Sequence, residues 1–440
     1  MKHIPPATDT EIQPATRFQI LIWTLFDLGS NAFIMLILTV VFPVYFTTVL
    51  AADRPDADFL WGAAFSISML IAAIISPILG AIADHSAGKK RFLLYFTILC
   101  IVSSAMLFFV GEHRLALGFV LLILANIGFE AGLVFYDSFL PEITTERSYG
   151  RVSGYGFAMG YVGSLLAVLC AYPLLIDGFI PDNYVNIRLT FVLAAVMFAV
   201  FATPLFFFLR DSKKSVSRSA PYITIGVNRV LTTLRNARRY SNIGKFLISY
   251  FIYFDAINTV VVFAAIYATV TLKFTITETL LFFITIQSTA IAGSIGFGIL
   301  ADSIGRKHTI SITLIIWIGV VIGAFLSQSK LTFFIIGMIA GLALGSCQAS
   351  SRSLMSTILP FHKRTEFFGF YSFFGKASAI IGPALFGLLS MFFNQRWAIL
   401  SIGFFFVIGL ILLQRVKEEP YSADGSEPID AIPGEYNKPE

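Results

Sequence analysis

The sequence predicts an all-α membrane protein with twelve transmembrane helices in two pseudo-symmetric six-helix bundles. Composition is the first indication, because the 440 residues are 57% hydrophobic and only 13% charged, with a mean hydropathy of +0.80. A soluble domain has about 25% charged residues, so this chain needs the bilayer as its solvent. Its apolar runs are long and continuous rather than alternating, which predicts helices and not a β-barrel. An internal repeat spaced by about half the chain is the third indication.

Twelve apolar segments follow one another, each near the roughly 20 residues that a membrane-spanning helix requires. The first is longer than one span needs, and we expect it to bend or end near Pro43. We place the segments at residues 17–49, 59–83, 91–110, 115–140, 152–176, 187–209, 244–271, 278–301, 308–327, 331–358, 366–392 and 396–415.

Polar stretches divide these segments into two halves of six, an N-terminal bundle at 17–209 and a C-terminal bundle at 244–415. The remaining stretches are a polar cytoplasmic tail, a basic cytoplasmic linker and an acidic cytoplasmic tail that we expect to be disordered, at 1–16, 210–243 and 416–440. Within the linker, Pro221–Tyr240 has apolar residues at helical spacing among arginines. It is either an amphipathic helix on the inner leaflet or a basic connector.

The distribution of Lys and Arg predicts that both termini are cytoplasmic, because most of the 31 basic residues then lie on the inner side. The outer side holds only Arg54, Arg114, Arg188, Lys273, Lys330 and Arg396. The formal charge of +5 therefore reflects basic loops and not a nucleic-acid surface. The chain has no Asn-x-Ser/Thr acceptor site, which favours a bacterial source and hence the inner membrane.

A motif with Gly, Asp and a basic cluster occurs twice, each time between two apolar segments. It reads Gly80-Ala-Ile-Ala-Asp84-His-Ser-Ala-Gly88-Lys89-Lys90-Arg91 and then Gly298-Ile-Leu-Ala-Asp302-Ser-Ile-Gly305-Arg306-Lys307. The preference of cytoplasmic loops for basic residues explains the Lys and Arg but not the matched Gly and Asp. Two further correspondences support the repeat, Phe26-Asp27 with Phe254-Asp255 and Leu140-Pro141 with Leu359-Pro360.

Charged residues inside the predicted spans are candidates for function, because each costs roughly 2.5–3.5 kcal/mol at the centre of a membrane helix. They are Asp27, Glu130, Asp137, Asp255, Arg352 and Lys376. Four of them belong to polar stripes on three helices, Asp27 with Ser30 and Asn31, Glu130 and Asp137 with Asn126, and Arg352 with Gln348. Lipid cannot solvate such stripes, so they must face one another or an internal cavity.

Two interpretations of these residues stay open. In the first they bind a solute, with a basic side chain on its anionic group, while an acid in excess carries a proton. The candidates for solute binding are Asp27, Asn31, Gln348, Arg352 and Lys376, and those for proton coupling are Glu130, Asp255 and Asp137. In the second interpretation the charges form structural ion pairs, Arg352 with Glu130 and Lys376 with Asp255.

The duplicated motif resembles the cytoplasmic signature of the major facilitator superfamily, which joins helices 2 and 3 and recurs between helices 8 and 9. The resemblance implies the major facilitator fold, in which helices 1, 4, 7 and 10 line a central cavity. The polar and charged residues described above lie on these four helices, with Lys376 on helix 11. The resemblance also implies a cytoplasmic latch, for which the gating candidates are Asp84, Arg91, Asp302 and Arg306.

Further stretches resemble the vacuole effluxer branch of that superfamily, which includes fungal autophagy-related permeases that export amino acids from the vacuole. They are Trp23–Phe33, Asp137-Ser-Phe-Leu-Pro141-Glu142, Gln348–Leu354 and Glu366–Lys376. The chain departs from that branch at Asp137, where an Asn is usual. The resemblance extends over helices 1 to 11.

These features predict a secondary transporter that moves a small polar, carboxylate-bearing, amino-acid-like solute by alternating access with proton coupling. The alternatives are an uncoupled facilitator and a translocator of a lipid-like or amphiphilic compound. The sequence shows no catalytic triad, phosphate loop, nucleotide motif or metal-ligand cluster, so we expect neither enzyme activity nor a cofactor or metal. The expected partners are the solute, protons and membrane lipids, and the expected state is a monomer.

Overall fold

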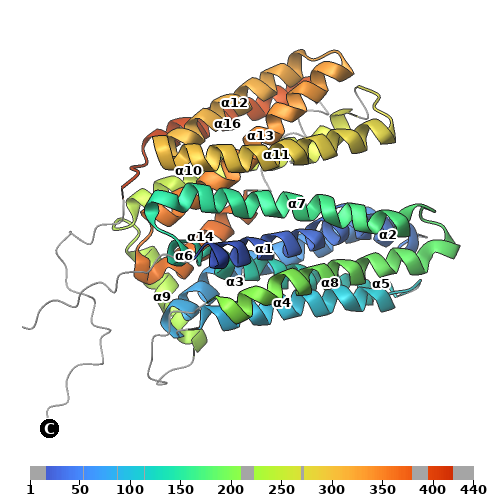
Figure 1. The fold of residues 1–440 in the computed structure, drawn as a ribbon, viewed down its shortest axis with the longest axis horizontal. Coiled ribbons are helices and arrows are strands. Elements are labelled where there is room, and N and C mark those ends of the chain that lie inside the picture. Colours follow the sequence, from blue (N-terminus) through green and yellow to red (C-terminus); the bar gives the residue numbers. More distant parts are fainter. Residues whose placement is uncertain are drawn as a thin grey trace, which may run out of the picture.

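The computed structural model describes residues 16–209 apart from 53, 87 and 113, together with residues 222–268, 272–378 and 395–419. This part of the chain consists of helices and their connections, and most of the helices run side by side (Figure 1). Within it, ten helical segments are long and apolar enough to cross a membrane, and α16 contains a shorter apolar helix. The predicted span 366–392 is described only to Ser378, and its remainder lies outside the described residues, as do most of the two predicted tails.

The first half of the chain has six long helical segments with short helical turns between them. In order these are α1 (Arg17–Phe33), a π-helical segment (Ile34–Val40), α2 (Phe42–Tyr45), a second π-helical segment (Phe46–Leu50), α3 (Ala57–Ser86), α4 (Lys89–Met106), a 3-10 turn (Leu107–Phe109), α5 (Leu115–Asp137), α6 (Leu140–Ile143), a 3-10 turn (Glu146–Ser148), α7 (Tyr149–Leu175), a 3-10 turn (Pro181–Asn183) and α8 (Tyr184–Phe208).

The second half repeats this pattern after one additional helix in the linker. The elements are α9 (Tyr222–Arg235), α10 (Ser241–Ile266), α11 (Ile276–Ile304), α12 (Arg306–Leu326), α13 (Lys330–Ile358), a 3-10 turn (Phe361–Lys363), α14 (Arg364–Ala377) and α16 (Gln395–Gln414). The linker stretch for which two interpretations were open therefore contains a helix over most of its length.

The first span starts at a capping box, in which Thr16 and Gln19 satisfy each other's backbone N–H groups. It does not end at Pro43. The backbone instead widens into π-helical turns on both sides of this residue, with the N–H of Val41 bonded to the carbonyl of Leu36 at 3.1 Å. The chain thus stays helical from Arg17 to Leu50.

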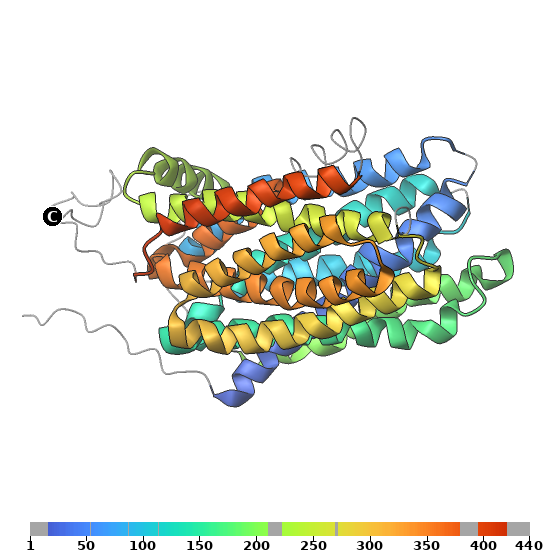
Figure 2. The same cartoon turned by 90° about the horizontal axis from the view of Figure 1, so that it is seen from above.

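Two apolar cores organise the helices. The first core uses buried side chains between Ile22 and Leu209, and the second uses side chains between Tyr240 and Val416 with Val134 of the first half. Figure 2 shows the second-half helices α11, α12 and α16, in yellow to red, in front of the blue and green first half. Each half therefore has its own core, and the contacts between the halves are of a different kind.

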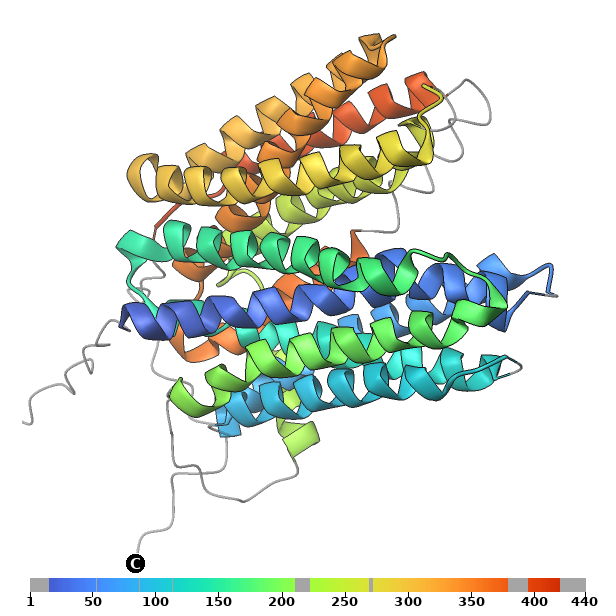
Figure 3. The ribbon, with the colours of Figure 1, turned by 45° about the vertical axis from the view of Figure 1, so that its right-hand side comes forward.

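Close backbone packing joins the halves along two pairs of helices, α7 with α11 and α3 with α14. A Cβ added to Gly154 of α7 would lie 2.2 Å from the carbonyl oxygen of Ser294 in α11. A Cβ added to Gly80 of α3 would lie 2.3 Å from the carbonyl oxygen of Thr365 in α14. Glycine at these positions lets the helices approach backbone to backbone. In Figure 3 the two groups of helices approach each other at the left and diverge towards the right.

Candidate functional site

Arg352 of α13 lies at the centre of a buried polar network between the halves, and only 2% of its surface is exposed. Its Nη1 donates a hydrogen bond to Oδ1 of Asp137 at 3.0 Å and lies 3.6 Å from Oδ2 of Asp27. Its Nε and Nη2 donate to the hydroxyl and carbonyl oxygens of Ser153, at 2.9 and 2.8 Å. Because these partners belong to α5, α1 and α7, one side chain of the second half holds three helices of the first.

Aromatic rings enclose the same guanidinium group. Its Cζ lies 4.1 Å from the ring centre of Phe157 and 4.9 Å from that of Trp23. Tyr136 stacks on Trp23 with ring centroids 4.6 Å apart and donates its hydroxyl to Oδ2 of Asp27 at 2.7 Å. A desolvated cation–π contact contributes about 2 kcal/mol. Hydrogen bonds, ion pairs and ring faces of the protein itself therefore hold Arg352 in one position.

A second buried ion pair joins Lys376 of α14 to Glu130 of α5. The Nζ of Lys376 lies 3.0 Å from Oε2 of Glu130 and also donates to the hydroxyl of Ser372, one turn earlier. The two side chains are 8% and 12% exposed, so water screens the pair weakly. As in the first network, the base comes from the second half and the acid from the first.

The predicted structural pair between Arg352 and Glu130 is wrong. Glu130 lies seven residues before Asp137 on α5, which corresponds to about 10 Å along the helix. Arg352 binds Asp137, and Glu130 pairs with Lys376 of α14. The predicted pair between Lys376 and Asp255 is therefore wrong as well. Both bases thus pair with acids other than those that the sequence suggested.

The other predicted solute-binding and proton-coupling residues have contacts nearby. Asn31 donates its side-chain amide to the carbonyl of Asp27 in its own helix at 2.8 Å. Gln348 accepts a hydrogen bond from the hydroxyl of Tyr161 at 2.5 Å. Asp255 is buried in α10, where its carbonyl oxygen accepts the hydroxyl of Thr259. The structure therefore unites Asp27, Asp137 and Arg352 in one network and forms a separate pair from Glu130 and Lys376.

Asp84, in the first copy of the repeated motif, binds the N-terminal end of α14. Its two carboxylate oxygens accept hydrogen bonds from the backbone N–H groups of Thr365 and Glu366, at 3.2 and 2.8 Å. The first turn of a helix has unpaired N–H groups and a partial positive charge, so a carboxylate there is stabilising. Asp84 therefore fastens the end of α3 to the start of α14, across the two halves.

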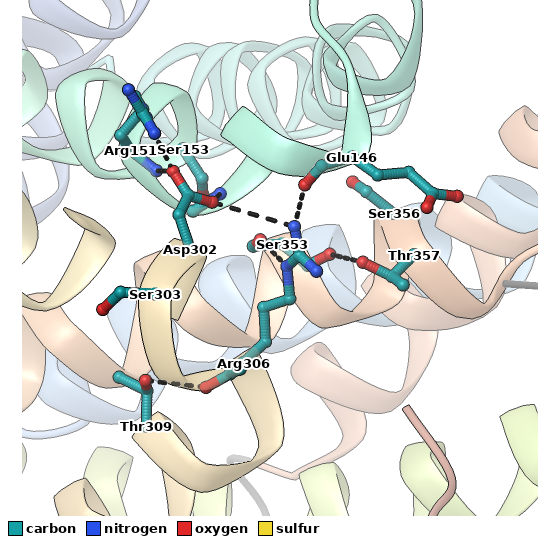
Figure 4. Close-up of polar contacts among 12 residues, drawn as sticks. Glu146, Arg151, Ser153, Asp302, Ser303, Arg306, Thr309, Ser353, Ser356 and Thr357 are labelled. Atoms are coloured by element: carbon teal, nitrogen blue, oxygen red, sulfur yellow. Dashed lines mark hydrogen bonds and ion pairs between the residues drawn. The ribbon is translucent and has the colours of Figure 1, made fainter. Parts of the chain in front are cut away.

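Asp302, in the second copy, makes the equivalent contact with α7. Its oxygens accept hydrogen bonds from the backbone N–H groups of Gly150 and Arg151, at 2.8 and 3.0 Å. Figure 4 shows Asp302 between Arg151 and Arg306. The side chain of Arg151 also donates to Asp302 at 2.8 Å, and Arg306 lies 3.7 Å from the same carboxylate. The matched Gly and Asp of the two motifs thus build two related junctions between the halves.

The turn after Asp302 requires a glycine, whereas the turn after Asp84 does not. Gly305 has φ +96°, a conformation that side chains other than glycine rarely adopt. Gly88 has φ −173°, which is ordinary extended backbone. The first motif has one residue more between its Asp and its second Gly than the second motif has, and this extra residue accompanies the change of turn.

The N-terminal end of α12, which starts directly after Gly305, has a cap of its own. The carboxylate of Glu418 accepts hydrogen bonds from the backbone N–H groups of Arg306 and Lys307, at 2.7 and 2.9 Å.

Sequence reasoning missed a third buried charged cluster at this end of the bundle. Glu142 of α6 pairs with Lys89, at the start of α4, and with Arg364, at the start of α14. All three side chains are at most 10% exposed. Arg91, the predicted gating residue of the basic run, is exposed on α4 and forms no ion pair with the described residues. One feature of the sequence could have revealed this cluster. Leu140-Pro141 is followed by the acid Glu142, whereas the matching Leu359-Pro360 of the second half is followed by Phe361.

Known proteins match most of the chain in sequence. The family model described as "Vacuole effluxer Atg22 like" matches residues 61–424. An uncharacterized MFS-type transporter of Bacillus subtilis, YxiO, is 29% identical over 93% of this chain and 97% of its own. Autophagy-related protein 22 of Kluyveromyces lactis is 26% identical over 79% of this chain and 77% of its own.

Solved structures share the fold at lower identity. The proton:xylose symporter XylE superposes with a TM-score of 0.71 at 16% identity, covering 91% of this chain and 96% of that one. The fucose:proton symporter FucP of E. coli superposes with a TM-score of 0.70 at 15% identity, covering 91% of this chain and 98% of that one. The family match and these folds agree with the helical architecture, the repeated motif and the charged helices. The chain belongs to the Atg22-like vacuole effluxer family of the major facilitator superfamily, and it is a multi-pass membrane transporter rather than an enzyme.

Proposed function

We propose that this transporter moves a small polar, carboxylate-bearing, amino-acid-like solute by alternating access, and that protons drive the movement. One observation carries the proposal. The two bases buried inside the membrane spans, Arg352 and Lys376, both belong to the second half, and the acids that they contact belong to the first. The attraction that holds the halves together there therefore depends on ionised acids of the first half, and a proton on one of them weakens it.

The Lys376–Glu130 pair is the proposed centre of coupling. Breaking a buried ion pair by removing one charge costs about 3–5 kcal/mol, because the remaining charge is left uncompensated. A solute carboxylate that reaches Lys376 replaces Glu130 as its partner, and a proton on Glu130 then neutralises the released acid. Binding of solute and proton thus favour each other, which is the requirement for coupled movement.

Arg352 has a different part in the proposal. Its donors are directed at Asp137 and Ser153, its charge is also balanced by Asp27, and its faces lie against aromatic rings. We assign it to closing the halves, with Asp27 beside it, while Lys376 binds the solute carboxylate. Asn31 and Gln348 lie on the same helices as Asp27 and Arg352 and are proposed to contact polar groups of the solute.

The two motif junctions supply the gate in this proposal. Asp84 and Asp302 hold α3 to α14 and α7 to α11 at one end of the bundle, and Arg306 and Glu142 add charged contacts there. With the termini inside, as the Lys and Arg distribution predicts, this end is cytoplasmic. The proposed cycle opens it when the buried pairs lose their charge balance. The proposed membrane is the bacterial inner membrane, and the proposed unit is a monomer.

A transport assay tests coupling directly. Purified protein is first screened by thermal shift against amino acids, peptides, sugars and organic acids, since a bound solute stabilises the native state. A stabilising solute is then followed into vesicles with and without an imposed pH gradient. We expect the gradient to drive accumulation in the native protein but not in Glu130→Gln. The matched control is Glu278→Gln, which removes an acid from the exposed pair with Lys330 and leaves coupling unchanged.

The two alternatives predict other outcomes. An uncoupled facilitator equilibrates the solute without responding to the pH gradient, and Glu130→Gln then transports like the native protein. A translocator of amphiphilic compounds is stabilised by lipid-like ligands and not by small carboxylates. The charged cluster favours the polar solute, because an apolar compound gives no compensation for separating buried ion pairs.

A further inference from the structure

The linker helix α9 has one face packed against the bundle and one face exposed. On the packed face, a Cβ added to Gly226 would lie 2.6 Å from Cγ1 of Ile82 and 2.9 Å from the carbonyl oxygen of Ile78, both in α3. Thr233, seven residues on, donates its hydroxyl to Glu366 of α14. This face thus spans the junction between α3 and α14, and α9 lies at one end of the bundle (Figure 1).

The exposed face combines leucines with arginines. Leu231 and Leu234 are 45% and 55% exposed, and Arg235 and Arg238 are exposed as well. By their spacing, Leu231, Leu234 and Arg235 lie on one side of α9, and Arg238 lies in the turn that follows the end of α9 at Arg235. Neither arginine forms an ion pair with the described residues, and the sequence from 222 to 240 contains four arginines and no acid.

The position of α9 on α3 shows what lies beyond this face. Ile67, Ile71 and Ile74 are exposed apolar residues of α3, and in a membrane protein such a stripe faces the hydrocarbon of the bilayer. Ile78 and Ile82 continue the stripe at helical spacing, but there α9 covers it. The lipid-facing surface of α3 therefore ends where α9 begins to cover it. Because this point lies at the end of the span, α9 lies at the depth of the phospholipid headgroups.

We infer that the face formed by Leu231, Leu234, Arg235 and Arg238 binds the surface of an anionic phospholipid leaflet. The leucines enter the boundary between headgroups and acyl chains, and the guanidinium groups bind phosphates. An anionic leaflet fits better than a protein partner, because the same helix supplies positive charge without any acid and lies beside a lipid-facing stripe. Through Thr233 and Gly226, lipid bound to α9 stabilises the α3–α14 junction.

Hydrogen exchange of the full-length chain in nanodiscs tests this inference. Discs of phosphatidylcholine are compared with discs that contain phosphatidylglycerol, and exchange is read from peptides that cover residues 222–240. We expect exchange in α9 to slow by about twenty-fivefold in the anionic discs, because each of the two arginines contributes roughly fivefold. High salt is expected to remove most of the effect, because it screens charges at the membrane surface.

Matched variants make the test specific. Arg235→Gln with Arg238→Gln is expected to lose the response to anionic lipid, whereas Arg54→Gln with Arg114→Gln, at the opposite end of the bundle, retains it. Leu231→Gln with Leu234→Gln is expected to exchange faster in both kinds of disc. If phosphatidylglycerol has no effect on the native chain, or if the α9 arginine variant responds like the native chain, the inference is wrong. Protection that depends on the number of protein copies per disc also overturns it, because the face then binds a second copy.

Discussion

Asp302, near the end of α11, accepts a hydrogen bond from the backbone N–H of Gly150 at 2.8 Å and thereby joins the second half of the chain to the first. A side chain at Gly150 would prevent this contact, because its Cβ would lie 2.4 Å from the carbonyl oxygen of Gly298. The glycine of one helix and the acid of another are thus parts of a single junction. Its strength decides how readily α7 and α11 separate.

Replacing Asp302 by Asn is expected to weaken this junction without unfolding the protein. A carboxylate at a partly buried helix N-terminus contributes up to about 2 kcal/mol, which corresponds to roughly a thirtyfold change in the ratio of closed to open molecules. We expect the variant to populate the open form more and to transport more slowly. Distances between spin labels at Thr145→Cys and Ser303→Cys measure the population, in a chain whose exposed Cys170 is replaced by Ser.

Two further variants provide the comparison for Asp302. Arg151→Gln removes a partner that is 47% exposed, so its effect is expected to stay below about 1 kcal/mol. Asp84→Asn is expected to act on the other junction, between α3 and α14, in the same direction. Native turnover in Asp84→Asn, in Asp302→Asn and in the double variant excludes a gating role for these acids.

Gly154→Ala is expected to force α7 and α11 apart. Its Cβ would lie 2.2 Å from the backbone oxygen of Ser294, which cannot move without its helix. Overpacking of this kind costs typically about 1–3 kcal/mol, and we expect a lower midpoint of thermal unfolding in detergent. Gly296→Ala on α11 is the control, because its Cβ meets nothing within 4 Å and Ala favours a helix. Equal midpoints for the two variants contradict the packing argument.

Arg352→Gln is expected to destabilise the protein by about 3–5 kcal/mol, since Asp27 and Asp137 then remain buried without their cation. Adding Asp137→Asn is expected to restore part of the loss, with an interaction energy of about 0.5–3 kcal/mol in the double-mutant cycle. Adding Glu130→Gln is expected to restore nothing, because Glu130 pairs with Lys376. If Glu130→Gln instead restores the midpoint of thermal unfolding, Arg352 pairs with Glu130 and not with Asp137, and the network described above is wrong.

Glu142→Gln is expected to cost about 3–5 kcal/mol as well, because two buried cations, Lys89 and Arg364, lose their shared carboxylate. The loss is expected mainly at the junction of α4, α6 and α14. Glu278→Gln offers a matched control, since its pair with Lys330 is 37–43% exposed and contributes at most about 1 kcal/mol. Unfolding midpoints of both variants check the difference, and a larger effect at Glu278 contradicts it.

The fold was predictable to a large extent because membrane spans leave a strong pattern in the sequence. The first segment shows the limit of that pattern. Apolar composition from residue 17 to 49 gave its length, but it did not show that the hydrogen bonding on both sides of Pro43 is π-helical. The linker shows another limit, since the spacing of Val230 and Leu234 fitted both a helix and a connector until Gly226 was seen against α3.

The charged residues were predictable as a set, but their pairing was not. Asp27, Arg352 and Lys376 stand out because charge inside a span is costly. Which acid meets which base depends on the rotation and height of separate helices, and no spacing within one helix reports this. The Glu142 cluster was missed for a related reason, since its three members lie near helix ends, where basic residues are ordinary and a charge carries little signal.

The π-helical turns of the first span have a consequence for the register of the chain. Each such turn accommodates an additional residue, and one residue corresponds to about 100° of rotation in an α-helix. Before the first π-helical segment, Asp27 points to Tyr136 and Arg352; after this segment, Phe42 packs edge-on against Phe191 and Trp61. If one residue between 34 and 40 is deleted, the part of the span after this segment is rotated about the helix axis relative to the part before it. The helix then presents either its carboxylate or its aromatic rings correctly, but not both.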